Sequence, residues 1–494
     1  MHLSNATPFQ QLSFILSGCL ALASAQSLTD DQVNAVKQRL AEGAIGSWEL
    51  GMRTQTLLEV DSPNFSVLTV GATVPPSIPL NSSASSSLSE VFAIVKNVVS
   101  EQNNTKPTNG EPLVDGDSSA GDPASLGAAV LLANWTGQGG EDFAGAARRQ
   151  VEYLCGSAVP KTADGAISHR VSQLQLWSDS VYMVPPFLAF YGVTTNNRSM
   201  VEAAYTQIKL YRNYLSDSTT KGLWKHIVLG QTGNDEGHWS TGNGMAAAGM
   251  LRVLGTMKNS QYSVSFVSEI EDLGLWTSDI HSGMFPFLQL NNLFKNYPDD
   301  WSATNFDDAA STALIAATVY RLALLTGNQT NIPRAEQIRQ TLFSTSTSNA
   351  RRASVRRFRA RADSLSSPAS TASEPSATAF ASAAHFSDDG WLTPVVNPDN
   401  YGAQGGNSPE GEAFALMLHS AWRDWNAAGS PGQNSNDPAR KSNTGPKAGG
   451  AGAGVLFVIL VVLFLRARTR RTQVVAPAPV FVTRRLVEVV EVVH

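Results

Sequence analysis

The chain has 494 residues, of which 42% are hydrophobic and only 16% are charged, and its formal net charge is -5. This length allows one large domain or two to three ordinary ones. Because the chain is mildly acidic and poor in charge, it offers no electrostatic attraction for nucleic acid, and we expect no such partner.

The N-terminal segment has the pattern of a secretory signal. Residues 12–25, LSFILSGCLALASA, form an apolar run that ends in small residues. The run is short for a membrane span, so we predict a signal peptide over residues 1–25. Cys19 leaves with it, and Cys155 then has no partner for an intrachain disulfide. Secretion agrees with six N-x-Ser/Thr triplets after residue 25, which predict a glycoprotein. These triplets begin at Asn64, Asn81, Asn103, Asn134, Asn197 and Asn328.

The middle of the chain is predicted to be helical. Apolar residues recur there at the spacings i, i+3, i+4 and i+7, and strict alternation is rare. The segments with this pattern are 29–45, 86–102, 122–135, 141–157, 176–192, 198–217, 241–257, 264–278, 306–327, 332–344 and 408–425.

Two kinds of helix are expected among these segments. Residues 198–217 are amphipathic, so one face should meet solvent, whereas residues 245–257 and 309–325 are apolar nearly all round and should be buried. Inner and outer helices that alternate around one centre would explain both kinds. We therefore predict one all-α domain over residues 26–430.

One stretch interrupts the helical pattern. Residues 345–389 are rich in Ser and Ala, begin with several arginines and lack regular apolar spacing. We predict a disordered insertion, because such a composition buries too little apolar surface to offset ordering entropy. Its dibasic pairs, Arg351-Arg352 and Arg356-Arg357, would also suit a processing protease.

The C-terminal part of the chain has the pattern of a membrane anchor. A polar linker over residues 431–447 leads to residues 448–465, which carry no charge and end in VLFVILVVLFL. We predict a transmembrane helix there, since about 20 apolar residues cross a bilayer. The following arginines predict a cytoplasmic tail over residues 466–494. The chain is thus expected to be a single-pass protein of the secretory pathway, with its large domain extracellular or lumenal.

Three loop-to-helix junctions concentrate polar, acidic and aromatic residues. They lie in residues 165–192, 223–250 and 296–317. In a ring of helices, the loops at the start of the inner helices face the central cavity. We therefore expect the functional site at these junctions.

The motifs in the first two junctions resemble a known enzyme family. The pattern L-W-x-D-x-x-Y-M-x-x-P-F-L over residues 176–188 is similar to a stretch of the unsaturated rhamnogalacturonyl hydrolases, glycoside hydrolase family 105 of the six-hairpin glycosidases. LWKH, residues 223–226, resembles the family's histidine segment, and HWSTGNGM, residues 238–245, resembles its W-x-R-G-N-G-W signature. The resemblance covers roughly residues 30–430 and implies an (α/α)6 toroid of six helical hairpins.

The resemblance also implies a reaction. In that family an acid protonates C4 of a terminal 4,5-unsaturated uronic acid, water adds at C5, and the hemiketal collapses to free the sugar. One carboxyl group can act as both acid and base if burial raises its pKa. The matching residue is Asp179, with Trp177 and Tyr182 as apolar walls. The alternative for Asp179 is a helix cap.

The other matched positions are implied substrate-binding residues: His226, Trp239, Thr241, Asn243 and Met245. For His226 the alternative is a loop histidine bonded to backbone. Asn243 and its flanking glycines permit a sharp turn whose N–H groups could face an anion, or they are a plain helix start.

Two matched positions depart from the family pattern. Thr241 stands where the family has Arg, and Met245 stands where it has a second Trp. Threonine cannot pair with a uronate as arginine does, and methionine does not replace an aromatic ring on a sugar face. These departures favour a second hypothesis, a membrane-tethered sugar-binding protein on a hydrolase scaffold without turnover.

A rival assignment uses the third junction. Asp307 and Asp308 precede an apolar helix, where they would be favourable charges at its N-terminus. Adjacent aspartates also occur in mannan-active six-hairpin glycosidases, which would give a two-carboxylate mechanism with Asp235 or Glu236 as further candidates. Trp224, Trp239 and Trp301 lie in the polar loops and are candidates for sugar stacking.

The sequence predicts no metal site and no cofactor. Its eight histidines do not show H-x-x-x-H spacing, and no cysteine pair accompanies them. The glycine-rich segment GQGGEDFAGAA lacks the Lys-Ser/Thr ending of a phosphate loop. The partners expected from the sequence are therefore an oligosaccharide or polysaccharide substrate and a membrane.

Overall fold

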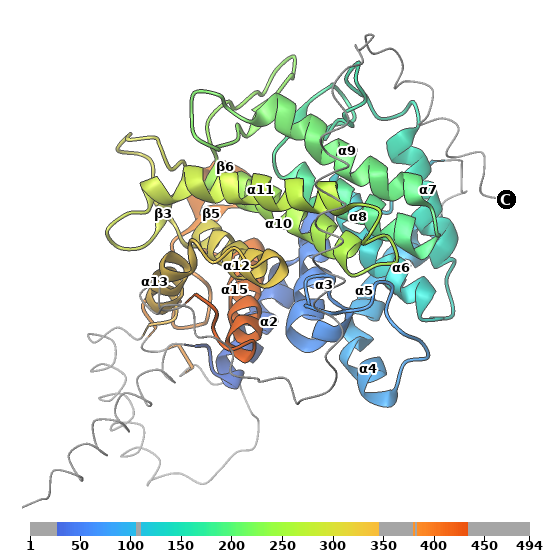
Figure 1. Cartoon of the computed structure of the whole chain (residues 1–494), viewed down its shortest axis with the longest axis horizontal. Helices are drawn as coiled ribbons and strands as arrows, with labels where there is room; N and C mark the ends of the chain where they lie inside the picture. Colours follow the sequence, from blue (N-terminus) through green and yellow to red (C-terminus); the bar gives the residue numbers. More distant parts are fainter. Residues whose placement is uncertain (1–26, 105–109, 345–378, 381–382, 433–494) are drawn as a thin grey trace, which may run out of the picture.

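The computed structural model describes residues 27–104, 110–344, 379–380 and 383–432. The predicted signal peptide, the transmembrane helix and the cytoplasmic tail lie outside these residues, as does the linker beyond residue 432. In the described part, twelve helices form two concentric layers (Figure 1). The inner helices are α3 (Ser47–Asp61), α6 (Gly127–Trp135), α8 (Ser180–Thr194), α10 (Ser240–Lys258), α12 (Ala309–Thr326) and α15 (Pro409–Ala427). The outer helices are α2 (Asp30–Gly43), α5 (Ser89–Asn104), α7 (Phe143–Cys155), α9 (Arg198–Leu215), α11 (Val267–Met284) and α13 (Ile332–Leu342).

The inner helices form a closed ring. Packing runs from α3 through the 3-10 turn η2 (Asp122–Leu126) to α8, and then to α10, α12, α15 and back to α3. Figure 1 shows the blue N-terminal helices α2 and α3 beside the orange α15, so the two ends of the domain close the ring. This arrangement is consistent with the expected (α/α)6 toroid.

Burial separates the two layers as the sequence predicted. All but one of the 19 residues of α10, and all but two of the 18 residues of α12, are buried. In α9 the buried residues instead follow one face, from Met200 to Leu215. Helix α12 is the one described helix that is long and apolar enough to cross a membrane, but 89% of it is buried in the domain. It is therefore a core helix of the ring.

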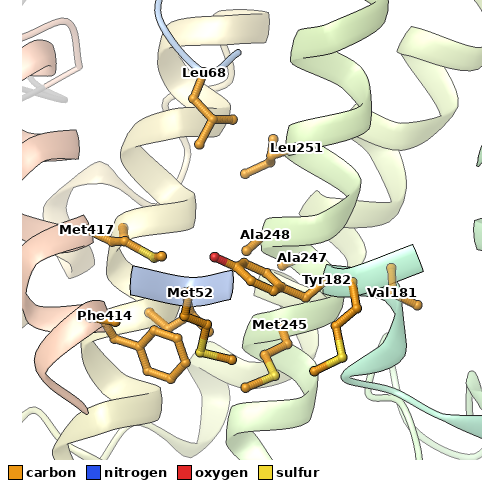
Figure 2. Packing of buried hydrophobic residues seen from close by; sticks show 14 of the residues in the cluster. Met52, Leu68, Val181, Tyr182, Met245, Ala247, Ala248, Leu251, Phe414 and Met417 are labelled. Carbon is orange, nitrogen blue, oxygen red and sulfur yellow. The ribbon is translucent and has the colours of Figure 1, made fainter. Parts of the chain in front are cut away.

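The centre of the ring is filled by large apolar side chains. Met52 of α3, Tyr182 of α8, Met245 of α10 and Phe414 of α15 point towards one another (Figure 2). Helices α8 and α10 approach closely because Gly249 has no side chain: a Cβ there would lie 2.0 Å from the carbonyl oxygen of Val181. The middle of the ring is thus a packed core, and any site must lie at one of its ends.

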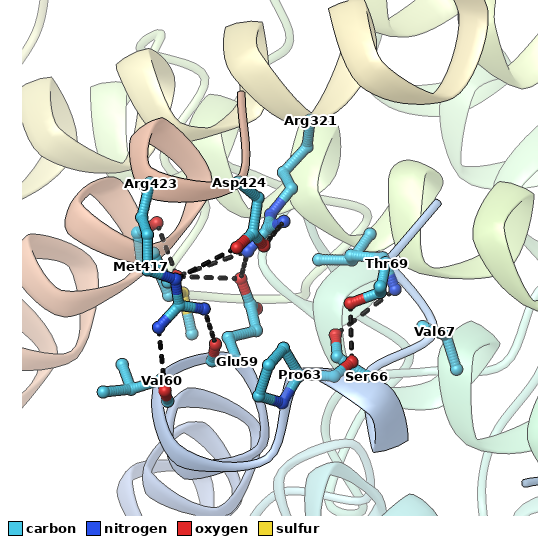
Figure 3. A network of polar contacts seen from close by, with 12 residues as sticks. Glu59, Val60, Pro63, Ser66, Val67, Thr69, Arg321, Met417, Arg423 and Asp424 are labelled. Atoms are coloured by element: carbon cyan, nitrogen blue, oxygen red, sulfur yellow. Dashed lines mark hydrogen bonds and ion pairs between the residues drawn. The ribbon is translucent and has the colours of Figure 1, made fainter. Parts of the chain in front are cut away.

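A network of buried charges ties α3, α12 and α15 together near their C-terminal ends (Figure 3). Arg321 Nη2 lies 2.8 Å from Glu59 Oε2, and its Nη1 lies 2.6 Å from Asp424 Oδ2. Arg423 donates to the carbonyl oxygens of Glu59 and Val60 at 2.7 and 2.8 Å. Glu59 and Arg321 are each only 3% exposed, so the network seals the joint between the first and last inner helices.

Short strands, which the all-α prediction did not include, occupy loops before the inner helices. The three antiparallel pairs are β1 (Leu176–Trp177) with β2 (Ile227–Val228), β3 (Phe294–Lys295) with β4 (Asp307–Asp308), and β5 (Val395–Asn397) with β6 (Asn400–Gly405). The smaller helical elements are α4 (Ser82–Ser87), η1 (Pro63–Phe65) and η3 (Phe285–Phe287). Strands β1 and β2 join the loops before α8 and α10, whereas β3–β4 and β5–β6 each pair within one loop, before α12 and α15.

The predicted insertion over residues 345–389 is described only near its end. Phe380 and Phe386 are buried and stack with ring centroids 4.6 Å apart, and Ala383 is buried beside them. This end of the segment therefore belongs to the packed domain, because its aromatic residues supply apolar surface that the Ser/Ala composition of the segment hides. Residues 345–378 lie outside the described residues.

Candidate active site

The inner helices begin at a common end of the ring, called the rim below. Thr241 at the start of α10 bonds to Asp308 before α12, and Ser125 of η2 donates to the carbonyl oxygen of Ser47 at the start of α3. A Cβ at Gly242 would lie 2.2 Å from Ser178 Oγ, which shows that the start of α10 touches the loop before α8. The three loop-to-helix junctions that are rich in polar, acidic and aromatic residues therefore meet at the rim.

Asp179 lies at the rim with a buried carboxyl group. It occupies the N-cap position of α8, yet its side chain makes no capping hydrogen bond. The residue is 8% exposed, and its Oδ1 has no hydrogen-bond partner. Burial raises the pKa of Asp179, although His226 and Arg170 partly offset this effect. Such a carboxyl group is suited to hold a proton and deliver it to a ligand.

His226 lies beside Asp179 because strands β1 and β2 pair. Trp177 is opposite Ile227, and the backbone N–H of Ser178 donates to the carbonyl oxygen of His226 at 2.9 Å. The ring is buried, its Nδ1 lies 2.9 Å from Asp235 Oδ2, and its Nε2 has no partner. A carboxylate acceptor at Nδ1 fixes that proton in place, so Nε2 is left free for a ligand.

Asp235 is itself held by two donors. The hydroxyl of Tyr297 donates to Asp235 Oδ2 at 2.5 Å, beside the contact from His226. Burial opposes ionisation, but the hydrogen bonds from His226 and Tyr297 outweigh it and lower the pKa of Asp235. Tyr297–Asp235–His226 is thus a chain of hydrogen bonds that orients the imidazole.

Aromatic rings surround His226. Trp239 lies 4.4 Å from it between ring centroids, Tyr401 of β6 lies 4.6 Å from it, and Trp177 lies 5.4 Å from it. Asn296 links two of these residues. Its Oδ1 accepts from Trp239 Nε1 at 2.9 Å, and its Nδ2 donates to the backbone carbonyl oxygen of Tyr401 at 2.7 Å. Aromatic walls beside polar groups are typical of sugar sites.

His238 anchors the loop that carries Trp239. Its Nδ1 lies 2.7 Å from Asp299 Oδ2, and its Nε2 lies 3.3 Å from Asp217 Oδ2. Two carboxylate acceptors require two N–H donors, so this ring binds as a cation. Burial lowers the pKa of His238, but the two carboxylates outweigh it and raise the pKa. These contacts hold together the three loops that carry Asp217, His238 and Asp299.

A second acid at the rim, Asp122, was not among the residues that the sequence singled out. It begins η2, and burial raises its pKa well above the usual range, with Asp117 and Asp179 adding to the effect. His169 Nε2 lies 3.8 Å from Asp122 Oδ1. The sequence signal was an acid before an apolar helix, in GDPASLGAAV, which reads equally well as a helix start.

Tyr401 was also missed. It lies in NPDNYGAQGG, a polar segment without periodicity. Its proximity to His226 depends on the β5–β6 hairpin and on Asn296, both of which come from distant parts of the chain. An aromatic residue in a glycine- and asparagine-rich loop was the only available signal.

Other predicted binding residues have structural contacts instead. Thr241 is buried with its hydroxyl 3.3 Å from Asp308 Oδ2. Asn243 clamps two loops, because its side chain bonds to the backbone N–H and carbonyl oxygen of Trp224 and to the carbonyl oxygen of Trp239. Tyr182 and Met245 lie one turn deeper, in the core (Figure 2). These side chains therefore support the rim from below.

The carboxylates of the rival assignment do not form a pair. Asp308 caps α12 by accepting from Ala310 and Ser311 N–H groups at 3.2 and 3.0 Å. Asp307, its neighbour on β4, instead contacts Asn291 and Lys295. Adjacent residues of a strand point to opposite faces, which separates the two carboxyl groups.

The structure also shows where the other residues of the rival assignment lie. Asp235 belongs to the chain that holds His226, and Glu236 pairs with Lys225 near the surface. Trp224 is buried at 1% exposure, whereas Trp301 is 75% exposed. Of the three tryptophans proposed for sugar stacking, Trp239 is therefore the one beside His226. Among the described residues, no group of three His, Cys, Asp or Glu side chains gathers in a metal-binding arrangement.

Six hairpins with an acidic, aromatic-lined rim define the class of the six-hairpin glycosidases, which this chain resembles in fold. Residues 89–320 match the family model of Glycosyl Hydrolase Family 88. Comparison with curated proteins gave no significant match.

Solved structures share the fold at low sequence identity. A structure from Klebsiella pneumoniae, named as a possible member of the GH105 family, has a TM-score of 0.55 at 13% identity and covers 80% of this chain and 93% of its own. A family 105 glycoside hydrolase from C. acetobutylicum has a TM-score of 0.51 at 13% identity, with 78% and 99% covered. An unsaturated glucuronyl hydrolase specific for heparin has a TM-score of 0.51 at 12% identity, with 84% and 99% covered. Together, the family match and the shared fold support a glycoside hydrolase.

Proposed function

We propose that this protein hydrolyses oligosaccharides that end in a 4,5-unsaturated uronic acid, as the unsaturated rhamnogalacturonyl hydrolases do with pectin fragments. The observation that carries the proposal is the carboxyl group of Asp179, which is buried, without a partner at Oδ1 and raised in pKa. A carboxyl group of this kind keeps its proton to higher pH than an exposed one, and in the protonated form it can transfer a proton to an enol ether.

The proposed steps use this chain's own residues. Asp179 donates its proton to C4, and an oxocarbenium ion forms between C5 and the ring oxygen. A water oxygen then bonds to C5, and its proton passes to the Asp179 carboxylate, which restores the acid. The C5 hemiketal opens to a ketone as the bond from C5 to the ring oxygen breaks, which leaves a hemiacetal at C1. That hemiacetal collapses to an aldehyde as its bond to the neighbouring sugar breaks, and the sugar leaves. Nε2 of His226 and the carboxyl of Asp122 are the nearby groups that would hold the water and the sugar hydroxyls.

The test follows the enol-ether absorbance of rhamnogalacturonan fragments prepared with a lyase. We expect wild-type protein to remove the absorbance and Asp179→Asn to lose about 100-fold or more in rate, as is typical when a general acid is removed. Asp307→Asn is the matched control, because that carboxyl contacts Asn291 and Lys295 away from His226. Equal rates for Asp179→Asn and wild type would refute the assignment.

A non-catalytic sugar-binding protein is the second candidate. Thr241, at the position of the family's arginine, is buried and bonded to Asp308, so it brings no charge to a uronate. This candidate predicts that the same fragments bind to the wild-type protein in calorimetry while their absorbance persists.

We also propose that the domain is tethered outside the cytosol. Support comes from the apolar segments at residues 12–25 and 448–465 and from the arginines after the second one. In cells, the full chain should remain with membranes after carbonate washing, and external protease should reach the helical domain. Recovery of the full chain in the soluble fraction would contradict this topology.

A further inference from the structure

A third acid, Glu410, lies in the first turn of α15 and takes no part in the proposed steps. It is only 3% exposed, and its Oε2 has no hydrogen-bond partner. A carboxyl group buried without a full set of partners is costly to keep, unless the empty oxygen meets a ligand.

The helix face places Glu410 at the rim. Phe414 lies four residues later on the same face of α15 and points into the central core with Tyr182 and Met245 (Figure 2). Asp179 precedes Tyr182 by three residues, so it lies one turn towards the N-terminal end of α8. Glu410 is related to Phe414 in the same way, and the two acids therefore lie in one layer, directly above the packed core.

The charged groups that shift the pKa of Glu410 belong to the same layer, which supports this position. Burial is the largest cause that raises its pKa well above the usual range, and Glu49 of α3, Asp179 of α8 and Asp308 before α12 raise it further. A hydrogen bond from Trp48 opposes them. Since several acids share a buried layer, they cannot all be ionised, and Glu410 can act as an O–H donor.

We propose that Glu410 binds the reacting sugar directly, by donating a hydrogen bond from Oε2 to a sugar oxygen. The inference rests on the proposed function for the identity of that sugar. It gives the layer of Asp179 an uncharged donor, at a site where Thr241 stands in place of the family's arginine. Glu410 is thus a specificity residue for the same site.

Helix α15 supplies a matched control two residues along. Glu412 is fully buried, its pKa is also raised by burial, and its Oε2 likewise has no hydrogen-bond partner, whereas its Oε1 accepts from the backbone N–H of Leu392 at 2.6 Å. The charge that acts on Glu412 is that of Arg39 of α2, which lies outside the rim. Glu410 and Glu412 therefore share helix, burial and charge, and they differ in what they face.

The experiment measures the affinity of a lyase-released unsaturated disaccharide by calorimetry. All variants carry Asp179→Asn, so that no turnover occurs. Loss of one hydrogen bond predicts that Glu410→Ala weakens binding about threefold to tenfold. Glu410→Gln keeps a donor and should stay within about twofold of the parent, as should Glu412→Gln. Thermal melting of each variant checks that it is folded.

Dependence on pH separates a sugar contact from a structural role. With Glu410 present, affinity should fall as pH rises through its raised pKa, because the ionised form cannot donate. With Glu410→Gln this fall should disappear. Hydrolysis by the wild-type protein is read separately. If wild type fails to hydrolyse the disaccharide while Glu410→Ala weakens its binding, the inference stands and the proposed function fails. If the parent does not bind the disaccharide, or if Glu410→Ala binds as Glu412→Gln does, the inference is overturned.

Discussion

The two ends of the ring differ in whether a cation contacts their acidic side chains. At the C-terminal ends of the inner helices, Glu59 and Asp424 both contact Arg321 (Figure 3). At the rim, Asp179 and Glu410 each keep a buried oxygen without a partner. The same residue type thus serves stability where a cation completes it, and it is available for chemistry where none does.

The electrostatics of the two ends follow from these partners. Burial disfavours the charge on Arg321, but Glu59 and Asp424 outweigh that effect and raise its pKa. At the rim, burial raises the pKa of Asp122, Asp179 and Glu410, and their mutual repulsion adds to the effect on Asp122 and Glu410. The C-terminal end of the ring therefore holds an ion network. At the rim, the acids keep their protons to higher pH than exposed carboxyl groups do.

The largest expected effect comes from removing Arg321 from the ion network at the C-terminal end of the ring. Arg321→Met would leave Glu59 buried without its cation and would remove one of the two arginines that contact Asp424, and such a loss of a buried pair typically destabilises a protein by about 3–5 kcal/mol. We expect a lower free energy of unfolding in urea, while the folded fraction keeps its kcat on lyase-released fragments. A fall in kcat without a change in the unfolding midpoint would show that this end is part of the site.

A smaller effect is expected from the chain that orients His226. Asp235→Asn removes the charge that accepts from His226 Nδ1, so the imidazole loses its fixed proton and orientation. A hydrogen bond to a charged group is worth about 1.5–3 kcal/mol, which predicts a fall in kcat/KM of about tenfold to a hundredfold. The Glu236→Gln variant serves as the neighbouring control, because Glu236 pairs with Lys225 near the surface. Equal losses of kcat/KM in both variants would show that Asp235 does not orient His226.

The unpaired acid at the rim should cost stability. Because the folded-state pKa of Asp179 is raised, its contribution to stability is lost as pH rises through that pKa. Asp179→Asn should therefore be more stable than wild type at neutral pH, by about 0.5–2 kcal/mol, a range common when a functional residue is replaced. Urea titrations at several pH values should show this gain disappear in acid. A gain that does not depend on pH would point to packing.

The smallest effect concerns the aromatic wall. Tyr401→Ala removes one ring beside His226 and Trp239. An aromatic contact is worth about 0.5–1.5 kcal/mol, so KM should rise by about twofold to tenfold with little change in kcat. Tyr401→Phe keeps the ring and should restore KM. If Tyr401→Phe is as impaired as Tyr401→Ala, the hydroxyl rather than the ring is in use.

Much of the fold could be predicted because helices carry local signals. Apolar residues all round 245–257 and 309–325 indicated inner helices, and the amphipathic pattern of 198–217 indicated an outer helix; α10, α12 and α9 confirm these assignments. The short strand pairs were not predicted, since strands of two to six residues show little periodicity and depend on how the loops before the inner helices fold. Phe380 and Phe386 were likewise hidden in a biased segment.

The site was predictable only in part, for the same reason. The motifs indicated Asp179, His226 and Trp239, which the ring brings to one rim. They could not show which side chains lie one turn deeper, so Met245 and Tyr182 were grouped with the binding residues although they pack in the core. Asp122, Tyr401 and Glu410 come from other hairpins, and only closure of the ring places them near Asp179.

The measurement that tests the account most directly is the pH dependence of kcat/KM on lyase-released unsaturated fragments. If Asp179 works as the proton donor, kcat/KM falls as pH rises through a pKa above the usual carboxyl range, and Asp179→Asn abolishes both the activity and this profile. An unchanged profile in Asp179→Asn would contradict it, because the proton would then come from another group.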